Sequence, residues 1–125
     1  MPTALIVEDE IFVALDLERI LTDAGYQVTA IAADRDSALA AGSQAEFAFV
    51  DINLRDGPTG PEIAKRMADD YGVKVVFVTA NPSQIGNVEC LGYIRKPFSD
   101  AAILAAAALA CEDHPVVHDD VIRLV

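Results

Sequence analysis

The chain has 125 residues, 53% of them hydrophobic, and a formal net charge of -11. This length and composition suit one compact domain with its own core, and the acidic balance repels nucleic-acid phosphate and anionic lipid. The apolar runs are too short to span a bilayer, and the start Met1-Pro2-Thr3 lacks the basic region of a secretory signal. We therefore expect a cytoplasmic protein that binds neither nucleic acid nor membrane, with Cys90 and Cys111 as buried or half-buried thiols.

Short apolar runs alternate with helical patterns along the chain. Gly25 and Gly72 follow two of the helical patterns as natural C-caps, and Asp34 and Ser99 precede two others as N-caps. In chain order, the pattern predicts a strand at 4–7, a helix at 13–24, a strand at 27–31, a helix at 34–41, a strand at 47–50, a helix at 63–71, strands at 73–78 and 93–95, and a helix from 99 to about 111.

Five strands that alternate with helices predict parallel pairing through right-handed crossovers. We expect an α/β fold, an open, doubly wound, five-stranded parallel sheet of flavodoxin-like order 2-1-3-4-5 with helices on both faces. Residues 1–112 should form this domain and residues 113–125 a C-terminal tail. Because the tail carries aliphatic residues, we expect it to be extended and to pack on the domain or on a second copy.

Polar side chains stand where four of the predicted strands end. Glu8 and Asp9 follow the first strand, Asp51 follows the third, Thr79 ends the fourth, and Lys96 follows the fifth. In an open parallel sheet these positions share one edge, where ligands bind. Three converging carboxylates suit Mg²⁺, and a carboxylate held between a cation and a lysine is a workable nucleophile toward phosphorus.

Four runs of residues carry a resemblance to a known family: Leu5–Glu10, Val50–Leu54, Val78–Ala80 and Lys96–Phe98. In this order and at these strand ends, they resemble the response regulator receiver domain of two-component signalling, in its stand-alone, single-domain form. The resemblance covers residues 3 to about 112. It implies a protein that takes a phosphoryl group from a histidine kinase or a phosphotransfer protein and signals through protein contacts, without an output domain.

Beyond self-catalysed phosphotransfer and autodephosphorylation, the resemblance implies no enzymatic activity. We expect a monomer or weak homodimer with an unknown downstream protein partner.

The resemblance also implies a role for each matching position. In chain order, the implied roles are Glu8 as an acidic partner of Mg²⁺ through water, Asp9 as a direct Mg²⁺ ligand, Asp51 as phospho-acceptor and metal ligand, Asn53 as a backbone-carbonyl ligand, Thr79 as the switch hydroxyl, Ala80 as a backbone N–H donor to the phosphoryl group, Tyr93 as the switch aromatic, Lys96 as the phosphoryl-binding lysine, and Lys96-Pro97 as a cis peptide bond.

Two segments depart from the family pattern. Arg55 stands where many receivers have a proline, in a loop that is one residue longer than the common form. Only 17 positions separate Thr79 from Lys96, which is shorter than usual by about a turn of helix. Because the segment 81–91 contains proline and glycine, we expect the fourth helix to be short or distorted.

Other interpretations remain open. A Mg²⁺-dependent phosphohydrolase with an aspartyl-phosphate intermediate would place a second Asp where this chain has Asn53. A pseudo-receiver that never takes phosphate is disfavoured by the intact set of polar residues, and a flavin or nucleotide binder by the acidic first turn. The acidic run 8–10 is also compatible with a helix N-terminus, and Tyr93 with simple packing.

Overall fold

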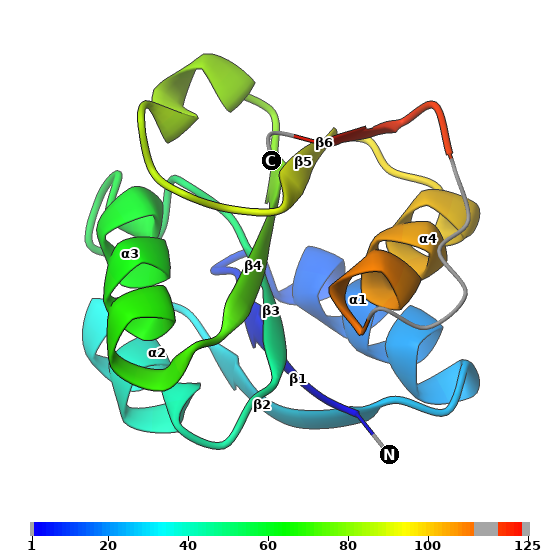
Figure 1. The fold of residues 1–125 in the computed structure, drawn as a ribbon, viewed down its shortest axis with the longest axis horizontal. Helices are drawn as coiled ribbons and strands as arrows, with labels where there is room; N and C mark the ends of the chain where they lie inside the picture. Colours follow the sequence, from blue (N-terminus) through cyan, green and yellow to red (C-terminus); the bar gives the residue numbers. More distant parts are fainter. Residues whose placement is uncertain (1, 112–117, 124–125) are drawn as a thin grey trace.

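The computed structural model describes residues 2–111 and 118–123. It contains one six-stranded sheet with helices on both faces (Figure 1). The elements in chain order are β1 (Thr3–Val7), α1 (Ile11–Asp23), β2 (Gln27–Ala32), α2 (Arg35–Gly42), β3 (Phe47–Val50), α3 (Gly60–Tyr71), β4 (Lys74–Thr79), the 3-10 turn η1 (Pro82–Ile85), β5 (Gly92–Arg95), α4 (Asp100–Ala110) and β6 (Val121–Arg123).

The sheet has the order β2-β1-β3-β4-β5-β6, and its first five strands are parallel, as predicted. The register pairs Val7 with Val50 and Thr79 with Arg95, so the strands end level with one another. The backbone N–H of Asp51 donates to the carbonyl of Val7 over 2.9 Å, which ties the end of β3 to the end of β1. The carboxyl ends of the strands therefore form one edge, which carries the predicted site.

Each face of the sheet packs into a core of its own. Figure 1 shows α1 and α4 on one side and α2 and α3 on the other. The first core includes Phe49, Leu17 and Ile103, and the second includes Phe77 and Met67. Strands β3 and β4 are buried along almost their whole length, because a parallel sheet covered on both faces keeps little side chain exposed.

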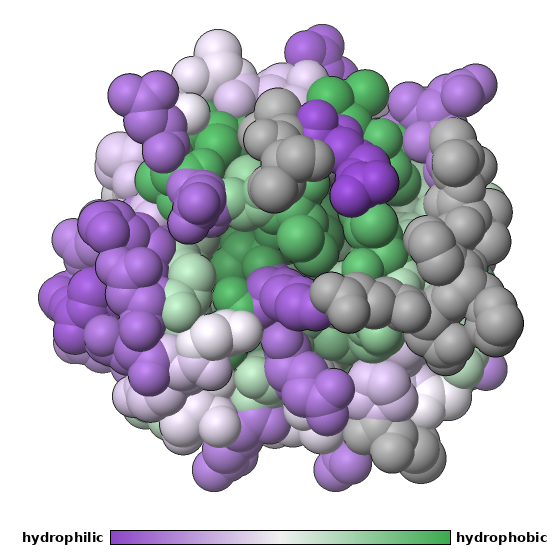
Figure 2. Space-filling view, in the orientation of Figure 1, coloured by the Kyte–Doolittle hydropathy of each residue, from purple (hydrophilic) through white to green (hydrophobic). Residues whose placement is uncertain are grey.

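The connection between β4 and β5 contains a 3-10 turn at Pro82–Ile85 where an α-helix is usual, which confirms the prediction of a short or distorted fourth helix. Pro82 starts this turn, and Gly86 ends it with a φ of 69°, a backbone conformation that suits glycine. Figure 2 shows apolar side chains in the middle of this face, over the region of β4 and β5, beside the polar surface of α3.

The sheet has one strand more than predicted. Residues Val121–Arg123 form β6, which pairs antiparallel with β5 and lies at the edge of the sheet. The prediction of five strands missed β6, because its three residues are extended only through their pairing with β5. The tail therefore packs on its own domain at these residues, one of the two arrangements that the sequence left open.

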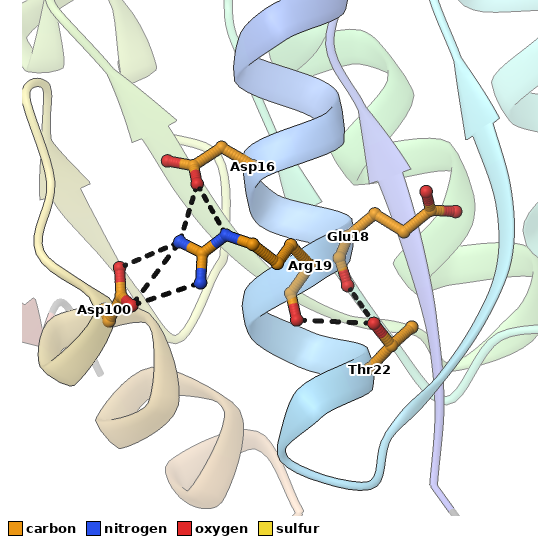
Figure 3. A network of polar contacts seen from close by, with 5 residues as sticks. All are labelled: Asp16, Glu18, Arg19, Thr22 and Asp100. Atoms are coloured by element: carbon orange, nitrogen blue, oxygen red, sulfur yellow. Dashed lines mark hydrogen bonds and ion pairs between the residues drawn. The ribbon is translucent and has the colours of Figure 1, made fainter.

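A polar network joins α1 to the start of α4 (Figure 3). Arg19 lies 2.7 Å from Asp16 on its own helix and 3.4 Å from Asp100, the first residue of α4. Ser99 caps α4 as predicted, because its hydroxyl accepts from the backbone N–H of Ala102. No helix in the described part of the chain has the length and apolar character that crossing a membrane requires.

Candidate functional site

Lys96 is the centre of the predicted site. Its Nζ lies 2.7 Å from Oε1 of Glu8 and 2.9 Å from Oδ2 of Asp51, and it lies 3.6 Å from Oε2 of the exposed Glu10. The backbone N–H of Lys96 donates to the carbonyl of Thr79 over 3.0 Å, so the lysine is fixed at the end of β5 beside β4. The Lys96-Pro97 peptide bond is cis, as predicted.

Glu8 is almost completely buried, with 2% of its surface exposed. Burial raises the pKa of its carboxyl group to about 7, although the hydrogen bonds from Lys96 and from the Glu10 backbone act in the opposite direction. Burial would lower the pKa of Lys96, but hydrogen bonds to Glu8 and Asp51 outweigh burial and raise it. Lys96 therefore stays charged, and the site holds more carboxylate than one lysine neutralises.

Glu8, Asp9 and Asp51 form a cluster that fits a divalent cation. Each offers one carboxylate oxygen, and these oxygens all lie within 4.8 Å of one another. Hard oxygen donors of this kind are what Mg²⁺ binds, usually through one or two carboxylates and several waters. Asp9 is exposed, which leaves room for such waters.

Asp51 has its two carboxylate oxygens in different environments. Oδ1 accepts a hydrogen bond from the backbone N–H of Ile52 over 2.7 Å, and Oδ2 faces Lys96. The residue is 8% exposed, so little of it is open to solvent. Oδ1 is thus held by a backbone N–H, and Oδ2 lies next to a cation.

Thr79, Ala80 and Tyr93 are the remaining predicted residues near this centre. Within the described part of the chain, none of the hydrogen bonds or ion pairs given for them involves Asp51. Thr79 is fully buried, and its hydroxyl accepts from the backbone N–H of Asn81 over 3.0 Å. Ala80 is exposed beside it, and Tyr93 is half-buried against the core on the α2 and α3 side. Their roles in phosphoryl binding and switching stay predictions.

Asn53 lies on the exposed loop after β3. Its side-chain amide donates to the side-chain oxygen of Gln84 over 2.9 Å, which links the loop to η1. The metal-binding role predicted for the backbone carbonyl of Asn53 stays a prediction. Nothing in the sequence of either segment predicts that the two loops meet.

Gly60 is a residue that sequence reasoning missed. It is buried at the start of α3, and a Cβ built on it would lie 2.2 Å from the backbone carbonyl oxygen of Asp51. Its backbone N–H donates to the carbonyl of Ile52 over 3.0 Å. The sequence offers one signal for this position, a glycine followed by Pro61 at the expected start of a helix. The same pair is common in ordinary turns, so it does not indicate a close backbone contact.

A cleft of about 460 Å³ opens next to Lys96, lined by Phe12, Val13 and Asp16 of α1 and by Lys96, Pro97 and Phe98. Phe12 is 84% exposed at its rim, and Ile11 and Leu15 on the same helix are exposed as well. Exposed aromatic and aliphatic side chains gathered beside a polar site are typical of a protein-binding surface.

The chain matches known proteins over most of its length. Residues 4–108 match the family model of the response regulator receiver domain. The phyllosphere-induced regulator PhyR of Methylorubrum extorquens is 31% identical over 112 residues, which covers 85% of this chain and 42% of PhyR. The chain thus spans less than half the length of the curated relatives it matches.

Solved structures show the same fold. The signal receiver domain of a modulated diguanylate cyclase from Desulfovibrio desulfuricans G20 superposes with a TM-score of 0.81 at 26% identity, covering 90% of this chain and 94% of that one. The anti-anti-sigma factor PhyR from Bartonella quintana gives a TM-score of 0.77 at 27% identity, covering 88% and 47%. Together with the model match over residues 4–108, these likenesses place the chain in the response regulator receiver domain family of two-component signalling.

Proposed function

We propose that Asp51 is the phospho-acceptor of this receiver. The observation that carries the proposal is the position of Asp51, whose Oδ2 lies 2.9 Å from Lys96 Nζ and whose carboxylate belongs to the cluster with Glu8 and Asp9. Oδ2 would attack the phosphorus of a phosphohistidine, a P–O bond would form as the P–N bond breaks, and the imidazole would leave with the electron pair. The reaction mainly needs charge neutralisation and alignment.

Glu8, Asp9 and Asp51 would hold Mg²⁺, together with the backbone carbonyl of Asn53. When bound, the ion neutralises charge on the transferring phosphoryl group. Lys96 would shift from the Asp51 oxygen to a phosphoryl oxygen, and charge-assisted hydrogen bonds of this kind are strong. The Thr79 hydroxyl and the Ala80 N–H would donate to the remaining oxygens.

The phosphoryl donor would dock on the cleft between α1 and the segment after β5. A histidine kinase or phosphotransfer protein has to bring an imidazole to Asp51, and the exposed Phe12 stands at the rim of the cleft that Lys96 lines. Arg19 supports this geometry, because it joins α1 to Asp100 at the start of α4. An apolar helix surface that carries a histidine is the partner chemistry that fits.

We infer that the phosphorylated state acts through a protein contact. Thr79 would turn toward the phosphoryl group, and Tyr93 on the neighbouring strand would follow, which shifts the population toward an active conformation. PhyR from Bartonella quintana is an anti-anti-sigma factor, and a regulator of an anti-sigma system is the downstream partner we propose here. We place this signalling in the cytoplasm, and we propose no enzymatic activity beyond self-catalysed phosphotransfer and autodephosphorylation.

Intact-mass measurement tests the proposal. The chain is incubated with acetyl phosphate and Mg²⁺, and we expect one phosphoryl adduct that is lost in Asp51→Asn. Asp36→Asn is the matched control, because its carboxylate side chain is 95% exposed on α2. An adduct that persists in Asp51→Asn, or no adduct at any Mg²⁺ concentration, would overturn the proposal.

A further inference from the structure

Strand β6 covers the outer edge of β5 with few contacts. It pairs Gly92 with Arg123, Tyr93 with Ile122 and Ile94 with Val121. Val121 is half-buried against the α1 and α4 core, and Ile122 and Arg123 are exposed. Elements with short ladders and little buried apolar surface open at the lowest free-energy cost. β6 is therefore the element of this sheet that detaches most easily.

Gly92 gives β6 its place on the sheet. A Cβ built on this glycine would lie 3.0 Å from Cα of Arg123 and 2.2 Å from the carbonyl oxygen of Ile122, and real Cβ atoms do not come as close as the second distance. The backbone of β6 thus occupies the space that a side chain at position 92 would take. The edge of β5 is shaped for a closely apposed strand, and β6 is the segment that fills it.

The same strand β5 leads into the phosphoryl site. On its inner side Arg95 pairs with Thr79 of β4, and the next residue, Lys96, contacts Asp51. On its outer side, Tyr93 pairs with Ile122. A cleft of about 380 Å³ connects the site with the tail. It is lined by residues of β5 and the segment after it and by residues of the tail: Tyr93, Arg95, Lys96, Pro97, Asp119, Asp120 and Ile122.

The chemistry of phosphorylation disturbs this cleft. Lys96 Nζ occupies the position next to Oδ2, so the lysine has to move when a phosphoryl group is placed on that oxygen. Phosphorylation also adds negative charge next to Lys96, which lines a cleft together with Asp119 and Asp120. Asp119 and Asp120 form the turn that precedes β6. Movement of Lys96 takes a cation away from this turn, and the added negative charge repels its carboxylates, so both effects weaken the packing of the turn against β5.

We propose that the edge of β5 is an output surface covered by β6 in the unphosphorylated chain, and that phosphorylation of Asp51 releases β6. This inference rests on the proposed function, since it takes Asp51 as the phospho-acceptor. The occupant of the surface in the resting state is the chain's own segment Val121–Arg123. Its release uncovers the backbone edge of β5, where an extended segment of a target protein binds by strand addition.

Hydrogen exchange in the full chain tests the release. With Mg²⁺ present, the backbone amides of 121–123 are followed with and without acetyl phosphate, while intact mass reports the phosphorylated fraction. We expect exchange at 121–123 to be at least about fivefold faster in the phosphorylated protein, with no change in Asp51→Asn. A phosphoryl adduct with unchanged or slower exchange overturns the inference alone. Absence of the adduct overturns the proposed function as well, and the mass separates the two failures.

Reciprocity gives a second test. If phosphorylation releases β6, then a variant with loosened β6 must bind a phosphoryl mimic more tightly, by up to the same factor when β6 is fully released. Gly92→Ala loosens β6 through the Ile122 clash, and Val121→Gly loosens it from the tail side and leaves β5 intact. Val28→Gly, a half-buried valine of the opposite edge strand, is the matched control.

We expect both β6 variants to bind beryllofluoride with Mg²⁺ at least about fivefold more tightly than the unmodified chain, by calorimetry. The control should bind within about twofold of it. Val121→Gly decides the outcome if Gly92→Ala fails to fold. Unchanged or weaker binding in Val121→Gly overturns the coupling.

Discussion

The first residue of α3, Gly60, lies directly against the backbone of Asp51, the proposed phospho-acceptor. A Cβ at position 60 would lie 2.2 Å from the Asp51 carbonyl oxygen and 2.6 Å from the Cα of Ile52. The Gly60 N–H donates to the Ile52 carbonyl over 3.0 Å, so helix and strand end are also hydrogen-bonded. The position of the Asp51 carboxylate therefore depends on how closely α3 approaches.

Gly60→Ala should move the acceptor. Because the added methyl group meets backbone, the start of α3 has to shift, and we expect a loss of about 1–3 kcal/mol in the free energy of unfolding. Displacement of Asp51 by a fraction of an ångström should also slow phosphorylation by acetyl phosphate by about 10-fold or more. Urea denaturation and the time course of intact mass measure the two effects.

Pro58→Ala in the same loop is the control, because Pro58 is exposed and should leave the rate unchanged. Comparing the rate with the Mg²⁺ affinity of Gly60→Ala separates a displaced acceptor from a general loss of folding. Phosphorylation at the normal rate in a folded Gly60→Ala protein would show that Asp51 does not depend on the approach of α3.

The sequence allowed the residues at the strand ends to be predicted, but it did not reveal where two backbone segments lie in close contact. Glu8, Asp51 and Lys96 could be placed together because each follows an apolar strand, and parallel strands end at one edge. Gly60 and Gly92 could not be recognised, because the need for glycine arises from a neighbouring backbone far away in sequence. Strand β6 was missed for a related reason, since its three residues owe their conformation to β5.

Lys96→Met should leave Asp51 without its cationic neighbour. Removing one preorganised charged donor from a site where charge develops costs about 10²-fold in rate or more, and we expect phosphorylation by acetyl phosphate to slow by that amount. Lys65→Met is the control, because Lys65 pairs with Asp69 on the exposed surface of α3. Equal rates for Lys96→Met and the unmodified chain would exclude a role for the lysine in transfer.

The buried carboxyl group of Glu8 should make stability depend on pH. Its pKa is about 7 in the folded chain against 4.5 for an unperturbed glutamate, with burial as the main cause. Between these values the folded state binds more protons than the unfolded state. The free energy of unfolding of the metal-free protein should therefore fall as pH rises through this window, by up to about 3 kcal/mol.

Urea denaturation in the presence of a chelator, from about pH 5 to about pH 8, measures this fall. Glu8→Gln cannot ionise, so its free energy of unfolding should decline less over the same range. Saturating Mg²⁺ should restore stability at the upper end for the unmodified chain, because a cation favours the ionised carboxylate. Parallel pH profiles for Glu8→Gln and the unmodified chain would contradict the assignment to Glu8.

Phe12 offers a way to separate docking of the donor from the chemistry at Asp51. Its side chain is 84% exposed at the rim of the cleft beside Lys96, so Phe12→Ala should change the free energy of unfolding by no more than about 0.5 kcal/mol. An aromatic anchor of a protein interface contributes about 2 kcal/mol or more. Phosphotransfer from a phosphorylated histidine domain should then fall by about 30-fold at low receiver concentration.

Acetyl phosphate does not use this surface, so its rate with Phe12→Ala should match that of the unmodified chain. Tyr71→Ala is the control, because Tyr71 is an exposed aromatic residue at the far end of α3. A loss in Phe12→Ala that appears equally with acetyl phosphate would place the effect in the Asp51 site. A loss confined to the protein donor would identify the α1 surface as the place where the phosphohistidine arrives, on the side of the molecule opposite to α3.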